Sequence, residues 1–133
     1  MPHHLSCRVY YEDTDVGGVV YYANYFKFAE RARTEGLRAA GIMQSLLLAE
    51  HGLAFAVRQV EAEFIKPARL DDLLTIATDL RDIGKASVTM HQTIARGAEL
   101  LVQFNVRLAA VNAKFRPVRI PVFVRAALQA AFP

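Results

Sequence analysis

The strongest constraint on the fold is a helical pattern whose apolar side consists mostly of small residues. Apolar and small residues recur at helical spacing from Tyr25 to Ala40, and charged residues occupy the other side. Gly41 follows as a natural C-terminal stop. Small side chains let a helix axis approach its neighbour closely, although they bury little apolar area per turn. We therefore expect this helix to lie in the hollow of a curved sheet.

The remaining pattern is mostly that of β-strands. Shorter helices are expected from Met43 to about His51 and over Val122 to Ala131. The expected strands are Leu5 to Tyr11, Leu53 to Phe64, Leu73 to Leu80, Ser87 to Ala95 and Leu100 to Val111. The last four runs are joined by short breaks with turn residues, which favours antiparallel neighbours. The chain thus predicts a single α+β domain over residues 1–133, with an antiparallel sheet of about five strands and the long helix on one face.

Composition narrows the class of protein. The 53% hydrophobic content fits a compact globule, and a net charge of +3 is too small to indicate a nucleic-acid partner. Cys7 is the single cysteine, which excludes an intramolecular disulfide and a thiol metal cluster and fits a reducing compartment. The sequence has neither a signal-peptide pattern nor an apolar run of 18 residues. We expect a soluble, cytoplasmic protein.

A single sheet of five strands leaves two edges with unpaired backbone groups. Pairing edge strands across a two-fold axis would cover them. We therefore expect a homodimer at least, with a homotetramer as the other possibility.

The candidate chemistry lies between the first predicted strand and the long helix. Asp15 follows the strand, precedes Gly17 and Gly18, and lies about seven residues ahead of the helix start. Unpaired N–H groups at a helix start suit an oxygen that develops negative charge. A carboxylate facing such donors is the minimum equipment for attack on an acyl carbonyl, with Asp15 as general base or nucleophile.

Two other interpretations of this segment stay open. Asp13 or Asp15 can simply bond nearby backbone in a turn whose glycines supply positive φ, which the residues alone favour as much as catalysis. A metal site on Glu12, Asp13 and Asp15 is favoured less. Its spacing does not match a calcium loop, and no histidine lies near it to favour a transition metal.

The same segment resembles the acyl-CoA thioesterases of the 4-hydroxybenzoyl-CoA thioesterase family, most closely the branch associated with the bacterial Tol-Pal envelope system. The segments that carry the resemblance are 9–15, 17–21, 24–25, 30–35 and 64–72. The resemblance implies a hotdog fold, in which the sheet wraps the long helix, and a dimer with active sites at the subunit interface. It also implies hydrolysis of a thioester to a free acid and CoA, with no metal or redox cofactor.

By this resemblance, the family's carboxylate falls on Asp15, and the backbone N–H of Tyr22 polarises the thioester carbonyl. Tyr11 stands where the branch has a tyrosine near the active site, and Gly18 and Val19 are expected to contact substrate. The Tol-Pal-associated branch usually has a histidine where this chain has Tyr22. A backbone donor survives that difference, and an aromatic acyl group becomes more plausible.

Other charged residues have less specific expectations. Glu30 is a second carboxylate on the long helix, where a related thioesterase branch uses a glutamate. We favour a structural pair with Arg33 over a catalytic role, and an ordinary pair of Arg31 with Glu35. His3 and His4 are expected at a frayed terminus. The cations available for CoA phosphates are Arg58, Lys66, Arg69, Lys85, Lys114, Arg116 and Arg119.

Two rival functions remain. A hotdog dehydratase needs a positioned histidine, and none lies near the motif, so this rival ranks well below hydrolysis. A non-catalytic module that binds acyl thioesters or acyl carrier protein is compatible with Asp15. Release of free thiol from a panel of acyl-CoAs separates a hydrolase from such a binder.

Overall fold

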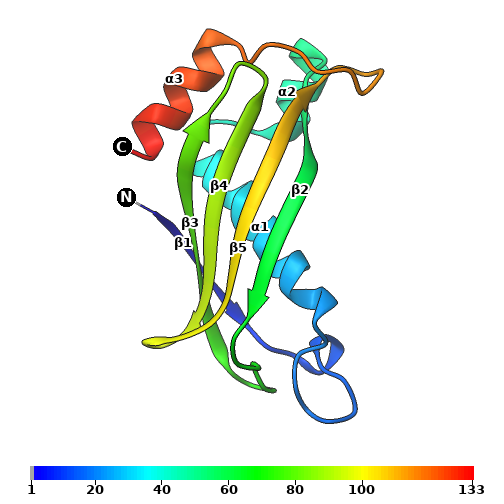
Figure 1. Cartoon of the computed structure of the whole chain (residues 1–133), viewed down its shortest axis with the longest axis vertical. Helices are drawn as coiled ribbons and strands as arrows, with labels where there is room; N and C mark the ends of the chain where they lie inside the picture. The colour runs from blue at the N-terminus through cyan, green and yellow to red at the C-terminus, as the bar shows by residue number, and fades with distance from the viewer. Residues whose placement is uncertain (1) are drawn as a thin grey trace.

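The computed structural model describes residues 2–133, which form one antiparallel sheet with helices on its concave face and at one end (Figure 1). The elements in chain order are β1 (His3–Arg8), the 3₁₀ turn η1 (Tyr11–Asp13), α1 (Ala23–Ala39), α2 (Gln44–His51), β2 (Ala54–Phe64), β3 (Leu73–Ile83), β4 (Ser87–Arg96), β5 (Glu99–Val111) and α3 (Val122–Ala131). The prediction of an α+β fold with a five-stranded antiparallel sheet is confirmed.

The strand order is β1-β3-β4-β5-β2, so β1 and β2 form the two edges. Figure 1 shows α1 crossing behind the long strands, with α2 and α3 near one end of the sheet. The loop that carries Asp15 lies at the opposite end. The start of α1 therefore lies beside this loop, far from α3.

The small-residue side of α1 is buried, as its spacing predicts. Ala29 and Ala32 are almost fully buried, and Phe28 packs in the same core as Phe104 of β5. Gly36 lies against the side chains of His3 and Phe132, which an added Cβ would meet at 3.6–3.7 Å. The small side chains thus let the helix lie close to the sheet and to the end of the chain.

A buried polar network also joins α1 to the sheet. Arg33 retains an exposed fraction of 9%, and its Nη1 donates to Oε1 of Gln92 at 3.0 Å. Nε2 of Gln92 donates to the carbonyl of Ala29 and to the hydroxyl of Thr78, both at 2.9 Å. Burial lowers the pKa of the Arg33 guanidinium. These bonds connect the helix to β3 and β4 without a buried carboxylate.

The expected helix-surface ion pairs are wrong. Within the described chain, Arg33 bonds to Gln92 and forms no salt bridge with Glu30, because its side chain is buried at the sheet. Glu35 pairs with Arg38 at 3.7 Å rather than with Arg31. Helical spacing alone allows either partner, so the rotamers decide between them.

The N-terminal strand also differs from the prediction. It begins at His3, which pairs with Thr78 of β3, so the first histidines are in the sheet and not frayed. It ends at Arg8 rather than at Tyr11, because Asp13 accepts the Tyr10 N–H through its side chain at 2.8 Å and the chain turns into η1. Over residues 2–133, no helix is long and apolar enough to cross a lipid bilayer.

Candidate functional site

The candidate acid lies on a tight loop, here called the acid loop (residues 14–22). The N–H of Tyr21 donates to the carbonyl of Asp13 at 3.0 Å, and the N–H of Asp15 donates to the carbonyl of Val19 at 2.9 Å. Gly18 turns the chain with a φ of 78°, in the region that favours glycine. These two hydrogen bonds join the two sides of the loop, so the position of Asp15 depends on that of Asp13.

The Asp15 side chain is exposed and only partly engaged. Its Oδ1 accepts the N–H of Gly17 at 2.8 Å, which is the turn bond expected of an aspartate before glycine. Among residues 2–133, no donor bonds its second oxygen and no cation pairs with the carboxylate. Asp15 therefore does bond the backbone of its own turn, as the turn interpretation states, and one carboxylate oxygen remains available.

The start of α1 offers donors beside this loop. Tyr22 precedes the helix and supplies no side-chain cap. In the described chain, the N–H groups of Tyr22 and Ala23 have no intramolecular acceptor, whereas the next two, of Asn24 and Tyr25, donate to nearby carbonyls. Unpaired N–H groups at a helix N-terminus favour an oxygen with negative charge.

A second loop, residues 65–72, packs against the acid loop. The N–H of Val20 donates to the carbonyl of Ala68 at 2.9 Å, and Val19 forms an isolated bridge with Arg69. The N–H of Ala68 in turn donates to the hydroxyl oxygen of Tyr25 at 2.9 Å. Burial raises the pKa of the Tyr25 phenol, so this acceptor stays protonated and neutral. The buried Tyr25 thus ties the second loop to the first turn of α1.

An open hollow of about 260 Å³ lies between these segments. It is lined by Val20, Tyr22, Tyr25, Phe64, Ile65, Lys66 and Pro67. The Phe64 ring, 48% exposed, contacts the rings of Tyr22 at 6.2 Å and Tyr25 at 5.8 Å between centroids. An aromatic and aliphatic lining suits the apolar part of a small ligand.

Four charges fix the 65–72 loop to the β4–β5 turn. Arg96 bonds Asp72 through Nη1 at 2.7 Å and Glu99 through Nη2, and Lys66 bonds Glu99 at 2.9 Å. The hydrogen bonds from Lys66 and Arg96 lower the pKa of Glu99 from its ordinary 4.5 to about 2. Burial disfavours ionised Asp72, but the bonds from the Arg69 N–H and from Arg96 outweigh it and lower its pKa.

Sequence reasoning missed this four-charge network. The spacing of Arg96 and Glu99 across a tight turn was the available signal, but it does not reveal Asp72 or Lys66 as partners. Lys66 was a candidate for CoA phosphates, and its ammonium is engaged by Glu99.

The predicted site residues are only partly brought together. Tyr22 lines the hollow, as does the unpredicted Val20. Asp15, Gly18 and Val19 lie on the adjoining acid loop but do not line it. Tyr11 is 82% exposed and borders a different, shallow depression with Tyr10, Glu12, Leu70 and Asp71. One chain therefore supplies the acid and the donors on neighbouring segments without enclosing them in one cleft.

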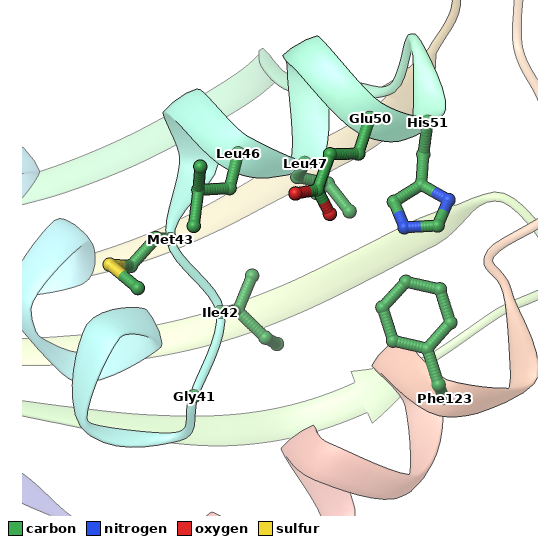
Figure 2. A pocket seen from close by; sticks show the side chains of 8 residues that line it. All are labelled: Gly41, Ile42, Met43, Leu46, Leu47, Glu50, His51 and Phe123. Carbon is green, nitrogen blue, oxygen red and sulfur yellow. The ribbon is translucent and has the colours of Figure 1, made fainter.

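A separate hollow of about 130 Å³ lies at the other end of the molecule, between α2 and α3 (Figure 2). Ile42 and Leu47 are its buried apolar residues, and Glu50 and His51 stand at its side. The His51 ring lies 4.9 Å from that of Phe123. None of the residues that line this hollow was a predicted site residue. In residues 2–133, no group of three His, Cys, Asp or Glu side chains is placed to hold a metal ion.

The chain is similar in sequence to a family of thioesterases and to curated members of it. A family model described as "Thioesterase superfamily" matches residues 17–103. The acyl-CoA thioesterase YbgC of Haemophilus influenzae is 44% identical over 121 residues, which cover 90% of this chain and 89% of that protein. The acyl-CoA thioester hydrolase YbgC of an Escherichia coli O6:H1 strain is 45% identical over 86% of each chain.

The fold has close solved counterparts as well. The crystal structure of a probable thioesterase from Bartonella henselae superposes with a TM-score of 0.88 and 40% sequence identity. The superposition covers 91% of this chain and all of that chain.

Proposed function

Because this chain belongs to the Thioesterase superfamily and is a thioester hydrolase, we propose that it hydrolyses acyl-CoA thioesters to a free acid and CoA. The names of the Haemophilus and Escherichia relatives, which match over most of their lengths, support acyl-CoA as the substrate class. Acyl carrier protein presents the same thioester on a phosphopantetheine arm and is the alternative carrier.

The observation that carries the mechanism is the pairing of an unengaged carboxylate oxygen with unengaged helix N–H groups on adjoining segments. Asp15 is the acid, and the Tyr22 N–H is the donor for the thioester carbonyl oxygen. Asp15 either takes a proton from the attacking water or attacks the carbonyl carbon itself. In the base route water attacks the carbonyl carbon, the carbon–sulfur bond breaks, and the proton taken by Asp15 passes to the leaving thiolate of CoA. In the nucleophilic route the carbon–sulfur bond breaks as Asp15 forms a mixed anhydride with the acyl group, and water then hydrolyses the anhydride to the free acid and the original carboxylate.

The oxyanion formed on attack carries charge that the helix start favours. Removing one such donor typically lowers a rate by about 100-fold to 1000-fold. The acyl group would lie in the hollow beside Phe64 and Tyr22, whose aromatic walls accept a flat or short acyl group without a polar partner. The adjoining Gly18 and Val19 would border the thioester from the acid loop.

A second copy of the chain would complete this site. In the described sheet, β2 has β5 on one side and no strand on the other. Its exposed side chains include Val57 and Phe64, and Phe26 of α1 lies next to Phe64 with ring centroids 6.2 Å apart. Pairing of two β2 edges would cover these groups and enclose the open hollow. We therefore include a homodimer, or a tetramer built from it, in the proposal.

Asp15→Asn tests the mechanism, because the amide keeps the size of the side chain but cannot act as base or nucleophile. Turnover of short, long and aromatic acyl-CoAs, followed by free-thiol release, is expected to fall at least about 100-fold. The melting temperature and the mass in solution should not change. Glu12→Gln is the matched control, since Glu12 is also an exposed carboxylate of this segment. Wild-type turnover by Asp15→Asn would reject the role of Asp15.

A further inference from the structure

We infer that Asn24 is a positioning residue of this reaction. Its side chain ties the base of the acid loop to the first turn of α1, and so holds the Asp15 carboxylate at a set place relative to the Tyr22 N–H. The inference rests on the proposed function, because it assigns a role toward the same acid and the same donor.

The tie is a single short hydrogen bond. Nδ2 of Asn24 donates to the carbonyl oxygen of Asp13 at 2.8 Å, and the bond is partly shielded from solvent. The same carbonyl accepts the N–H of Tyr21 at 3.0 Å. One oxygen therefore holds both the returning strand of the acid loop and the helix itself.

Asp13 passes this constraint on in two directions. Its carboxylate accepts the N–H of Tyr10 at 2.8 Å, which ties the last residue of η1 to the residue before its start. Two residues later, the N–H of Asp15 bonds the carbonyl of Val19 at 2.9 Å. Asn24 thus holds Asp13, which lies two residues before Asp15 in the chain, and Val19 holds the backbone of Asp15 itself.

The absence of an ordinary helix cap explains why such a tie is needed. A Ser, Thr, Asp or Asn at the N-cap commonly anchors a helix start, because its side chain accepts the N–H of the second or third helical residue. Here Tyr22 makes no such bond. The N–H groups of Asn24 and Tyr25 donate to backbone carbonyls, whereas within residues 2–133 those of Tyr22 and Ala23 have no acceptor. Asn24 donates backward to Asp13 instead, which anchors the helix start and keeps those N–H groups available.

The amide is the group that this geometry requires. Asp13 presents a carbonyl oxygen, so the partner must donate, and an aspartate at position 24 would face it with another acceptor. The acyl group would be held by the aromatic hollow, where Asn24 is not a lining residue. Loss of the tie should therefore disturb the approach of the reacting groups and leave substrate binding almost unchanged. A misplacement of about 1 Å can cost about 100-fold in rate.

The experiment compares Asn24→Ala and Asn24→Asp with wild type, each also combined with Asp15→Asn. In the wild-type background both single variants are expected to lower kcat by about 10-fold to 100-fold, with KM within about twofold. In the Asp15→Asn background, single-turnover thiol release should fall no further, because the group being positioned is already lost. The matched control is Gln44→Ala, which removes another partly buried side-chain amide bond, to Thr34. It should leave kcat unchanged.

The outcomes separate this inference from the proposed function. If wild type releases no thiol from any acyl-CoA of the panel, the proposed function fails. If wild type is active and Asp15→Asn keeps its turnover, the role of Asp15 is rejected and the positioning role of Asn24 toward it falls as well. If Asp15→Asn is inactive while Asn24→Ala keeps wild-type kcat, the positioning role alone is overturned. Full activity of Asn24→Asp would also overturn it, because the donor would then be unnecessary. An equal fall in both backgrounds would indicate a general structural effect and reject positioning.

Discussion

The acid loop and the 65–72 loop lie side by side, yet Asp15 of the first and Asp72 of the second differ in whether a cation pairs with the carboxylate. Asp15 accepts one backbone N–H and, in the described chain, has no cation partner. Asp72 is bonded by both Arg96 and the N–H of Arg69. The first loop is held by backbone hydrogen bonds, so its side-chain charge remains available. The second loop has backbone bonds as well, to Leu101 and Val9, but its Asp72 and Lys66 are in addition paired with opposite charges.

In the proposed mechanism, this difference keeps the region rigid while the Asp15 carboxylate stays unpaired. Val20 and Ala68 join the two loops through their backbones. The ion network that holds the 65–72 loop therefore also supports the acid loop, although no cation of the described residues pairs with Asp15. Changes in the network should act on stability, and changes at Asp15 should act on turnover.

The largest effect on stability is expected from Arg96→Met. This change keeps an unbranched apolar stem but removes the cation that joins Asp72 to Glu99, leaving two carboxylates close together. The melting temperature should fall by about 5–10 °C, with kcat within about threefold of wild type. Arg38→Met is the control, because Arg38 forms an exposed pair with Glu35 that contributes little. A fall in kcat like that of Asp15→Asn, with an unchanged melting temperature, would contradict the division between the loops.

A smaller effect is expected from Asp72→Asn. The amide oxygen can still accept the Arg69 N–H, but the charge-assisted bond to Arg96 is weakened. We expect a loss of about 1 kcal/mol and a fall of about 4 °C in melting temperature, with hydrolysis retained. Thermal unfolding and thiol release on the same preparation measure both. Inactivity of Asp72→Asn with full stability would show that the two carboxylates do not differ as stated.

The smallest effect on stability is expected from lowering the pH, through protonation of Glu99. The pKa of Glu99 in the folded protein is about 2, below its ordinary 4.5, so its ion pairs stabilise the fold above pH 4.5. That contribution is lost as the pH falls from 4.5 toward about 2. The difference in melting temperature between wild type and Glu99→Gln should therefore shrink across this window. A difference that is independent of pH would mean that the charge of Glu99 does not contribute.

Much of the fold could be predicted because it depends on local periodicity. The stripe of small residues predicted the buried side of α1, and Ala29 and Ala32 are indeed almost fully buried. Turn residues predicted the antiparallel strands. The burial of Arg33 could not be predicted in this way, since its acceptor Gln92 lies 59 residues away. A helical wheel shows which way a side chain points but not what a distant strand presents there.

The candidate site likewise has features that the sequence predicts and features that it does not. Asp15, the glycines and the start of the helix at Ala23 follow from the order of residues and from the family resemblance. The hollow beside Phe64 does not, because it forms where the end of β2 meets the start of α1. Tyr11 was expected in the same site, but the 3₁₀ turn directs it to a different surface. Its substrate contact therefore stays a prediction that a single chain does not support.

The sequence by itself determined the alternation of helix and strands and the presence of an acid beside a helix start, because hydrophobic period and turn chemistry are properties of neighbouring residues. Only the tertiary structure decided which carboxylates form ion pairs and which remain unpaired. Asp72 is neutralised because Arg96 reaches it from the end of another strand, while Asp15 faces solvent on a loop closed by backbone bonds. Electrostatic pairing depends on distances of a few ångströms between segments far apart in the chain, and the fold alone sets those distances.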